Sequence, residues 1–123
     1  MTSNNTGMTL VLALSYSGRW EIVDATKRIA SKIKEGTLAL EDIDESLFAS
    51  SLNTDGIPDP ELLIRTSGEY RLSNFLLWQL AYSEFYFSEV LWPDFRKQDL
   101  VDAIKDYQSR ERRFGKISEQ INN

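Results

Sequence analysis

At residues 62–69 the chain has the sequence LLIRTSGE, in which a short apolar run leads directly into a polar loop. A continuous apolar run of this length, bounded by turn-forming residues, indicates a short buried strand. In open α/β sheets, ligands bind at the edge where the strands end and the loops begin. We therefore expect the polar groups that follow Ile64 to lie at a ligand-binding edge.

Strands and helices alternate on both sides of this stretch. Apolar runs predict strands at residues 8–16 and 84–87. Apolar residues three and four apart predict helices at residues 20–35, 41–52 and 98–117, the second interrupted near Asp44. Ser73 or Asn74 can cap a further helix at 75–81, and turns are expected at 53–60 and 91–95. This alternation indicates an α/β fold with a mostly parallel sheet flanked by helices.

Length and composition limit the possible functions. A chain of 123 residues with 41% hydrophobic content is long enough for one core, so we expect a single domain or part of one. A net charge of -5 argues against nucleic-acid partners. The sequence has no Cys and no His, so any chemistry depends on carboxylates, hydroxyls, Arg and Lys. With no long apolar stretch and no signal-peptide pattern, we expect a cytoplasmic protein.

The loop at residues 65–74 gathers two guanidinium groups and three aliphatic hydroxyls around a glycine. Arg65 and Arg71 offer planar forks of donors that match phosphate oxygens in pairs, and pyrophosphate fits such a site. In a structural alternative, the arginines pair with Glu61 or Glu69, and the serine before the next helix is only its cap. The pattern of residues leaves both interpretations open.

Three further groups of residues could have a role in function. Glu84 and Asp94 could help to hold Mg²⁺, which needs only one or two carboxylates beside pyrophosphate oxygens, although surface carboxylates are common. The arginines of residues 110–113 could reach a ligand or simply complement a helix dipole. The aromatic residues predict either core packing or a subunit interface, and they are Trp78, Tyr82, Phe85, Tyr86, Phe87 and Trp92.

Several ordered motifs in the chain have a family resemblance. In order they are PDPELLIRTSGE at 58–69, RLSNFLLWQ at 71–79, AYSE at 81–84, LWPDF at 91–95 and RERRFG at 110–115. Together they resemble the signature of the cis-prenyltransferases, with the bacterial undecaprenyl pyrophosphate synthases as the most similar type. The resemblance spans nearly the whole chain.

This resemblance implies a transferase that adds isopentenyl pyrophosphate, with cis geometry, to an allylic starter such as farnesyl pyrophosphate. It implies Mg²⁺ as the cofactor, a homodimer whose interface uses the aromatic region, and contact of the polyprenyl product with a membrane surface. It assigns the pyrophosphate of isopentenyl pyrophosphate to Arg65, Arg71 and Ser73, and a metal role to Glu84. Accessory roles would fall to Arg19, Glu69, Asn74, Arg110, Arg112 and Arg113.

The chain departs from the family pattern in two respects. Ser15 and Ser17 stand where the family usually has Asn and Gly. The family's amino-terminal half, with its metal-binding Asp and its allylic pyrophosphate site, has no counterpart in this sequence. We therefore expect residues 1–123 to form a single partial domain that binds isopentenyl pyrophosphate and dimerises, binds the allylic substrate only with the missing half, and has little turnover alone. The alternative is a non-catalytic remnant that dimerises or binds pyrophosphate.

Overall fold

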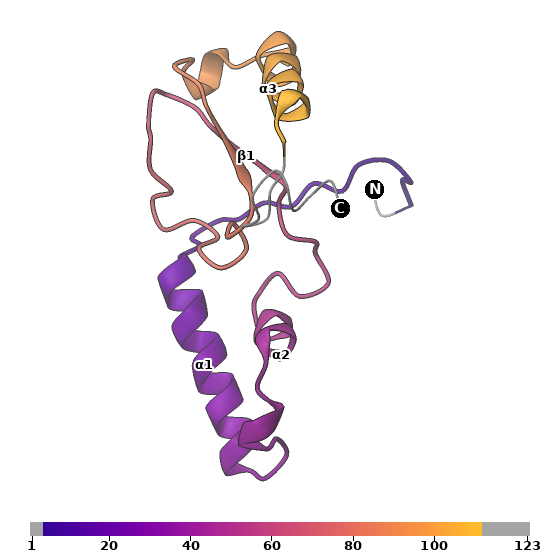
Figure 1. Cartoon of the computed structure of the whole chain (residues 1–123), viewed down its shortest axis with the longest axis vertical. Helices are drawn as coiled ribbons and strands as arrows, with labels where there is room; N and C mark the ends of the chain where they lie inside the picture. The colour runs from indigo at the N-terminus through magenta and orange to yellow at the C-terminus, as the bar shows by residue number, and fades with distance from the viewer. Residues whose placement is uncertain (1–3, 112–123) are drawn as a thin grey trace.

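A computed structural model of the chain describes residues 4–111 and shows an α/β fold. Two helices, α1 (Gly18–Lys34) and α2 (Glu45–Ser50), lie on one side of a small sheet, and α3 (Lys97–Ser109) lies on the other side (Figure 1). The sheet consists of β1 (Leu62–Arg65) and β2 (Glu84–Phe87). Short 3₁₀ turns, η1 (Leu40–Asp42) and η2 (Trp92–Asp94), connect these elements. The α/β prediction is thereby confirmed.

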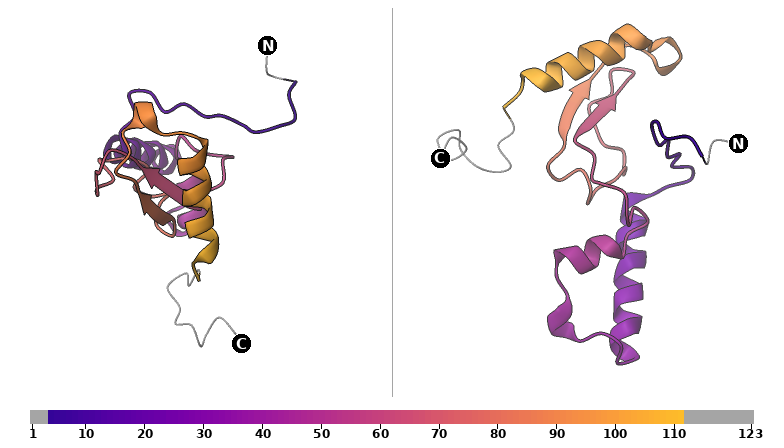
Figure 2. Two further views of the ribbon diagram at one scale, coloured as in Figure 1. Left: turned by 90° about the horizontal axis from the view of Figure 1, so that it is seen from above. Right: turned by 90° about the vertical axis from the view of Figure 1, so that its right-hand side faces the viewer.

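The two strands are parallel, as the sequence predicted, with Leu62 opposite Glu84 and Arg65 opposite Phe87. Their carboxyl ends therefore share one edge of the sheet, and the loops that leave this edge start side by side. Helix α3 packs against β2 (Figure 2) and buries Ala103 completely. The sheet and α3 together support the loop that begins at Thr66.

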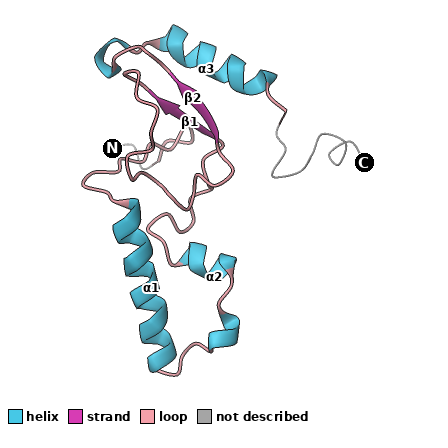
Figure 3. Ribbon diagram, turned by 60° about the vertical axis from the view of Figure 1, so that its left-hand side comes forward, coloured by secondary structure: helices cyan, strands magenta, loops and turns pink. Residues whose placement is uncertain are grey.

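Helix α1 begins two residues before its predicted start because Ser17 is the N-cap, and its hydroxyl accepts a hydrogen bond from the Trp20 N–H at 3.3 Å. One stripe of α1 is buried, and it consists of Gly18, Glu21, Ala25 and Ile29. Helices α1 and α2 contact each other and project from the sheet as one arm (Figure 3). The predicted interruption near Asp44 is confirmed, because its carboxylate accepts from the Leu47 N–H at 2.7 Å and caps α2.

The predicted strand at residues 8–16 is wrong. Residues 8–14 have no regular secondary structure, and their side chains are exposed, with Met8 at 90% and Leu14 at 81%. A strand requires a hydrogen-bonded neighbour, and the sheet formed within residues 4–111 contains only β1 and β2. The apolar pattern therefore lacks a partner in the part of the chain that the structure describes.

The predicted helix at residues 75–81 is also wrong, because this segment forms a series of turns. Ser73, Asn74 and Leu76 have φ angles of 50°, 66° and 44°. These values lie in the left-handed region, where a right-handed helix cannot start. The Leu80 N–H still donates to the Leu76 carbonyl at 3.0 Å, so a helix-like hydrogen bond remains within the turns.

The last helix, α3, ends at Ser109, whereas the prediction extended it to residue 117. Residues from 112 onward lie outside the described range.

No helix within residues 4–111 is both long and apolar enough to cross a membrane. Few large apolar side chains are buried in this range. The exposed large apolar residues include Leu91, Trp92, Leu100 and Ile104.

The aromatic residues do not form one cluster. Trp78 packs on Phe48 with ring centroids 4.5 Å apart, and Phe85 meets Phe87 edge to face at 6.1 Å. Tyr82 and Trp92 are exposed instead. Part of the tract therefore packs inside the chain, and the predicted interface role of the rest remains a prediction.

Candidate functional site

A cleft of about 840 Å³ opens where β1 ends and its loop begins. Its first wall comes from the loop after β1 and includes Arg65, Thr66, Ser67, Glu69 and Arg71. Its second wall comes from η2 and the start of α3 and includes Trp92, Phe95, Arg96, Lys97 and Leu100. The cleft therefore lies at the sheet edge where the sequence predicted a ligand.

The three residues predicted to hold pyrophosphate lie close to one another. Arg65 and Arg71 both line the cleft, and the Arg65 Nη2 donates to the Ser73 hydroxyl at 3.5 Å. Arg71 forms an ion pair with Glu69, as the structural alternative proposed, but 66% of its side chain remains exposed. Ser73 does not cap a helix, because the residues directly after it form turns. The guanidinium of Arg71 thus remains accessible to an anion.

The loop between Arg65 and Arg71 is hydrogen-bonded to the segment after β2. The Ser67 N–H donates to the Val90 carbonyl at 2.9 Å, and the Gly68 N–H donates to the Ser88 carbonyl at 3.0 Å. The Tyr70 hydroxyl donates to the Glu89 carboxylate, and this hydrogen bond raises the pKa of Tyr70. These contacts fix the direction in which the loop leaves the sheet.

Asn74 connects the cleft loop to the start of α1. Its carbonyl accepts from the Gly18 N–H, its Oδ1 from the Arg19 N–H, and its Nδ2 donates to the Ser17 hydroxyl, each at 2.8 Å. Gly18 permits this close approach, since a Cβ there would lie 2.9 Å from the Leu77 Cγ. Asn74 and Arg19, both predicted as accessory residues, are therefore brought into contact across 55 residues of sequence.

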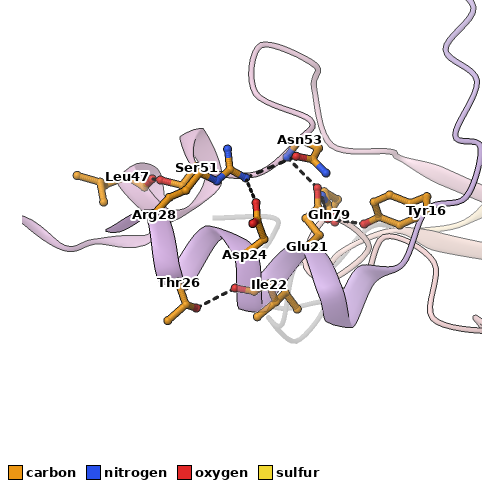
Figure 4. Close-up of polar contacts among 10 residues, drawn as sticks. All are labelled: Tyr16, Glu21, Ile22, Asp24, Thr26, Arg28, Leu47, Ser51, Asn53 and Gln79. Atoms are coloured by element: carbon orange, nitrogen blue, oxygen red, sulfur yellow. Dashed lines mark hydrogen bonds and ion pairs between the residues drawn. The ribbon is translucent and has the colours of Figure 1, made fainter. Parts of the chain in front are cut away.

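A group of polar residues around the buried Glu21, which the sequence interpretation missed, lies at the start of α1 (Figure 4). We call it the Glu21 joint, and it consists of Glu21, Tyr16, Asn53 and Gln79. Only 1% of Glu21 is exposed. Its Oε1 accepts from the Asn53 N–H at 2.8 Å, and its Oε2 accepts from the Tyr16 hydroxyl and from the Gln79 Nε2 at 3.1 Å. Burial of the ring, together with this hydrogen bond to Glu21, raises the pKa of Tyr16.

A signal for this joint is present in the sequence. Glu21 stands four residues before Ala25 and eight before Ile29, so it falls on the apolar stripe of α1. Carboxylates are almost never fully buried unless they are paired. A Glu on such a stripe therefore predicts buried donors nearby, although it does not identify them.

Glu84, the predicted metal ligand, lies at the other end of the sheet. It begins β2, whereas Arg65 pairs with Phe87 at the carboxyl end, roughly 10 Å further along the strand. The Arg110 Nη1 contacts the Glu84 Oε2 at 2.9 Å, and the Arg110 Nε donates to Asp106 at 2.9 Å. The hydrogen bond with Glu84 raises the pKa of Arg110. The accessory residues Arg112 and Arg113 lie outside the described range.

The fit of a magnesium ion to this chain can be judged from these positions. Glu84 does not line the cleft, where Glu69 is the acidic residue. Within residues 4–111, no three carboxylates gather as a metal-binding group. Glu84 and the arginine cleft therefore do not form one metal site within the described part of a single chain, and we assign no chemical step to a metal.

Comparison with known proteins gives a consistent result. Residues 1–115 match the family model described as "Putative undecaprenyl diphosphate synthase", where diphosphate is a synonym of pyrophosphate. An isoprenyl transferase of Chlorobaculum tepidum is 60% identical, over 98% of this chain and 46% of the relative. A farnesyl-diphosphate-specific ditrans,polycis-undecaprenyl-diphosphate synthase of Aliivibrio fischeri is 52% identical, over 98% of this chain and 47% of the relative.

A solved structure agrees with these sequence matches. The crystal structure of lavandulyl diphosphate synthase from Lavandula x intermedia, in complex with dimethylallyl diphosphate, superposes with a TM-score of 0.87 at 50% identity. The match covers 92% of this chain and 49% of that one. The chain thus spans about half the length of the curated relatives it matches.

Proposed function

We propose, since this chain belongs to the undecaprenyl diphosphate synthase family, that it forms the isopentenyl pyrophosphate-binding part of a cis-prenyltransferase. Such an enzyme joins isopentenyl pyrophosphate to an allylic pyrophosphate and produces a polyprenyl pyrophosphate. The observation that carries this proposal is the placement of Arg65 and Arg71 on one cleft, with Ser73 bound to Arg65.

The chemistry of the cleft supports binding of an anion that carries a short apolar tail. Guanidinium groups form charge-assisted hydrogen bonds with phosphate oxygens, often two at a time. Apolar side chains line the same cleft, among them Leu72, Phe75 and Leu100. A pyrophosphate head would lie at the arginines, and the five-carbon isopentenyl group would lie against the apolar surface.

The reaction that we propose needs a second pyrophosphate site. The C–O bond of the allylic pyrophosphate breaks, the double bond of isopentenyl pyrophosphate attacks the allylic carbon, and a proton then leaves the product. The residues of this chain would bind and orient isopentenyl pyrophosphate. The allylic pyrophosphate would bind only with the additional residues that the longer relatives contain, so we expect little or no turnover by these 123 residues alone.

The remaining expectations belong to the same proposal. Mg²⁺ is the proposed cofactor. Glu84 could bind it only if a pyrophosphate also lies near the amino end of β2, where Glu84 is located. Arg110, which now pairs with Glu84, would have to release it there. We further propose a cytoplasmic homodimer that contacts the membrane surface through its lipid product.

A second candidate function is a non-catalytic module that dimerises or binds pyrophosphate. The observation that favours it is the exposed apolar segment at residues 8–14, which has no neighbouring strand within residues 4–111. An exposed segment of this kind promotes association with another chain. A second polypeptide that supplies the missing half and restores turnover would favour the enzyme over this alternative.

The test is a calorimetric titration of the 123-residue chain with isopentenyl pyrophosphate, with and without Mg²⁺. We expect the chain to bind and the Arg71→Ala variant to bind at least about tenfold more weakly, because it loses a charge-assisted contact. Lys34→Ala is the matched control, since it removes the same charge from the far end of α1. Equal affinity of the chain and of Arg71→Ala would contradict the proposed site.

A further inference from the structure

The cleft has cationic side chains on both of its walls. Arg65 and Arg71 come from the loop after β1, and Arg96 and Lys97 come from the start of α3. Glu69, which pairs with Arg71, is the acidic residue of the lining. The cleft thus gathers four cations and one carboxylate in a chain whose net charge is -5. Such a local excess of positive charge attracts a multivalent anion.

Arg96 is held in place by its own turn. Its Nη1 donates to the Pro93 carbonyl at 2.5 Å and to the Phe95 carbonyl at 3.1 Å. Both acceptors are neutral, so the charge of the guanidinium is not cancelled by these bonds. The nearby Asp99 carboxylate accepts from the Arg96 backbone N–H at 2.7 Å, not from its guanidinium. The remaining guanidinium donors are therefore available to a ligand in the cleft.

Lys97 is the less constrained of the two cations. Within residues 4–111, its ammonium group has no ion-pair partner. The stacked rings of Trp92 and Phe95, 6.3 Å apart and inclined by 17°, support the turn that precedes it. Lys97 therefore contributes an uncompensated charge to the second wall of the cleft.

We propose that Arg96 and Lys97 are additional pyrophosphate-binding residues, which contact the anion from the start of α3 while Arg65 and Arg71 contact it from the loop after β1. This inference rests on the proposed function and extends it, because it predicts a preference for pyrophosphate over a single phosphate. A pyrophosphate carries two phosphoryl groups, so one can contact each wall, whereas a single phosphate contacts one wall at a time. Specificity of this kind comes from a charge placed to match the second group.

The experiment titrates the full 123-residue chain with inorganic pyrophosphate and, separately, with inorganic phosphate. Lys97→Gln is the first variant, because it removes a charge that forms no ion pair in the described structure. Arg96→Gln/Lys97→Gln removes both charges, and Arg96→Lys restores a cation at the first position. The control is Lys27→Gln/Lys34→Gln, which makes the same change in net charge on α1, away from the cleft. Circular dichroism of each variant checks its helix content.

We expect Lys97→Gln to weaken pyrophosphate binding about threefold and the double variant about tenfold, with phosphate binding changed much less. Arg96→Lys should retain most of the affinity, and the α1 control should bind like the parent chain. The inference is overturned if the double variant keeps full pyrophosphate affinity while Arg71→Ala loses it, a result that leaves the proposed function intact. An equal loss in the α1 control also overturns it. No pyrophosphate binding by the parent chain overturns both proposals.

Discussion

The Glu21 joint and the arginine cleft differ in how far their charged side chains are buried and paired. In the joint, a carboxylate is 1% exposed, and its oxygens accept from donors on three different segments. In the cleft, Arg71 is 66% exposed, and its ion-pair partner within residues 4–111 is Glu69, two residues away. Buried charges are costly unless they are fully paired, whereas exposed ion pairs contribute little to stability. Stability should therefore depend on the joint, and ligand binding should depend on the cleft.

The two regions are nevertheless connected. Gln79 of the joint and Asn74 of the cleft loop belong to the same segment of turns after β1. Both bind residues at the beginning of α1, Gln79 through Glu21 and Asn74 through Ser17. The joint thus holds the far end of the loop whose near end contains the arginines. A side chain far from the ligand can therefore change the cleft by changing the fold.

The largest effect should follow the change Glu21→Ala. It leaves the Asn53 N–H and the Tyr16 hydroxyl without their acceptor, and the Gln79 Nε2 keeps only the Thr54 hydroxyl, at 2.9 Å. Each buried donor that loses its partner costs about 1–3 kcal/mol, and with partial access of water we expect a total loss of about 3 kcal/mol in the free energy of unfolding. Urea denaturation measures this loss.

The control for this prediction is Glu35→Ala, because Glu35 is an exposed glutamate at the end of the same helix. It should change the free energy of unfolding by less than about 0.5 kcal/mol. Comparable losses in the two variants would show that the joint is no more important for stability than a surface carboxylate.

A smaller effect is expected at the cleft loop from Gly68→Ala. Gly68 has a φ of 63°, and a Cβ there would lie 2.6 Å from the Glu89 Oε2. A residue with a Cβ is strained in this left-handed region, and we expect a destabilisation of about 1–2 kcal/mol. Thermal unfolding measures it. Adding Glu89→Ala should recover only the steric part, so full recovery would contradict the role of the backbone conformation.

The smallest effect concerns the dependence of stability on pH. The pKa of Tyr16 is raised in the folded chain from its ordinary value of 10.0. The unfolded chain therefore loses this proton first, and the contribution of Tyr16 to stability is complete below about pH 10 and decreases as the pH rises further. Because the ring is half-buried and screened by solvent, we expect a loss of less than about 1 kcal/mol at pH 10.5.

Tyr16→Phe tests this expectation by chemical denaturation at pH 8 and at pH 10.5. The variant should be less stable than the parent at the lower pH, and the difference between them should become smaller at the higher pH. A constant difference at both pH values would show that the hydroxyl of Tyr16 does not titrate differently in the folded and unfolded chains.

The sequence was sufficient to predict the elements that form without distant partners. Apolar residues at helical spacing located α1, and the residues at 62–64 and 84–87 gave both strands and their parallel pairing. The polar loop after Ile64 was correctly expected at the sheet edge, because that expectation depends only on the order of strand and loop. The structure brings Arg65, Arg71 and Ser73 together there, and their role in binding remains a prediction.

The features that sequence patterns did not predict depend on contacts between distant segments. Residues 8–16 have the composition of a strand, but a strand also needs a neighbour, and residues 4–111 provide none. Residues 75–81 have a helical pattern, but Asn74 uses its hydrogen-bonding groups to bind Ser17, Gly18 and Arg19, and its backbone adopts a positive φ. The partners of Glu21 come from three other segments, so spacing alone could not identify them.

The hydrogen bond between Gly18 and the Asn74 carbonyl also has a consequence for the order of folding. The helices can form from local contacts within microseconds, but this bond joins residues 18 and 74, which are far apart in the sequence. It can form only after the turns that follow β1 have come back to α1. The arginine loop would then be the last part of the molecule to become ordered, and a refolding chain would regain its helix signal before it regains affinity for anions.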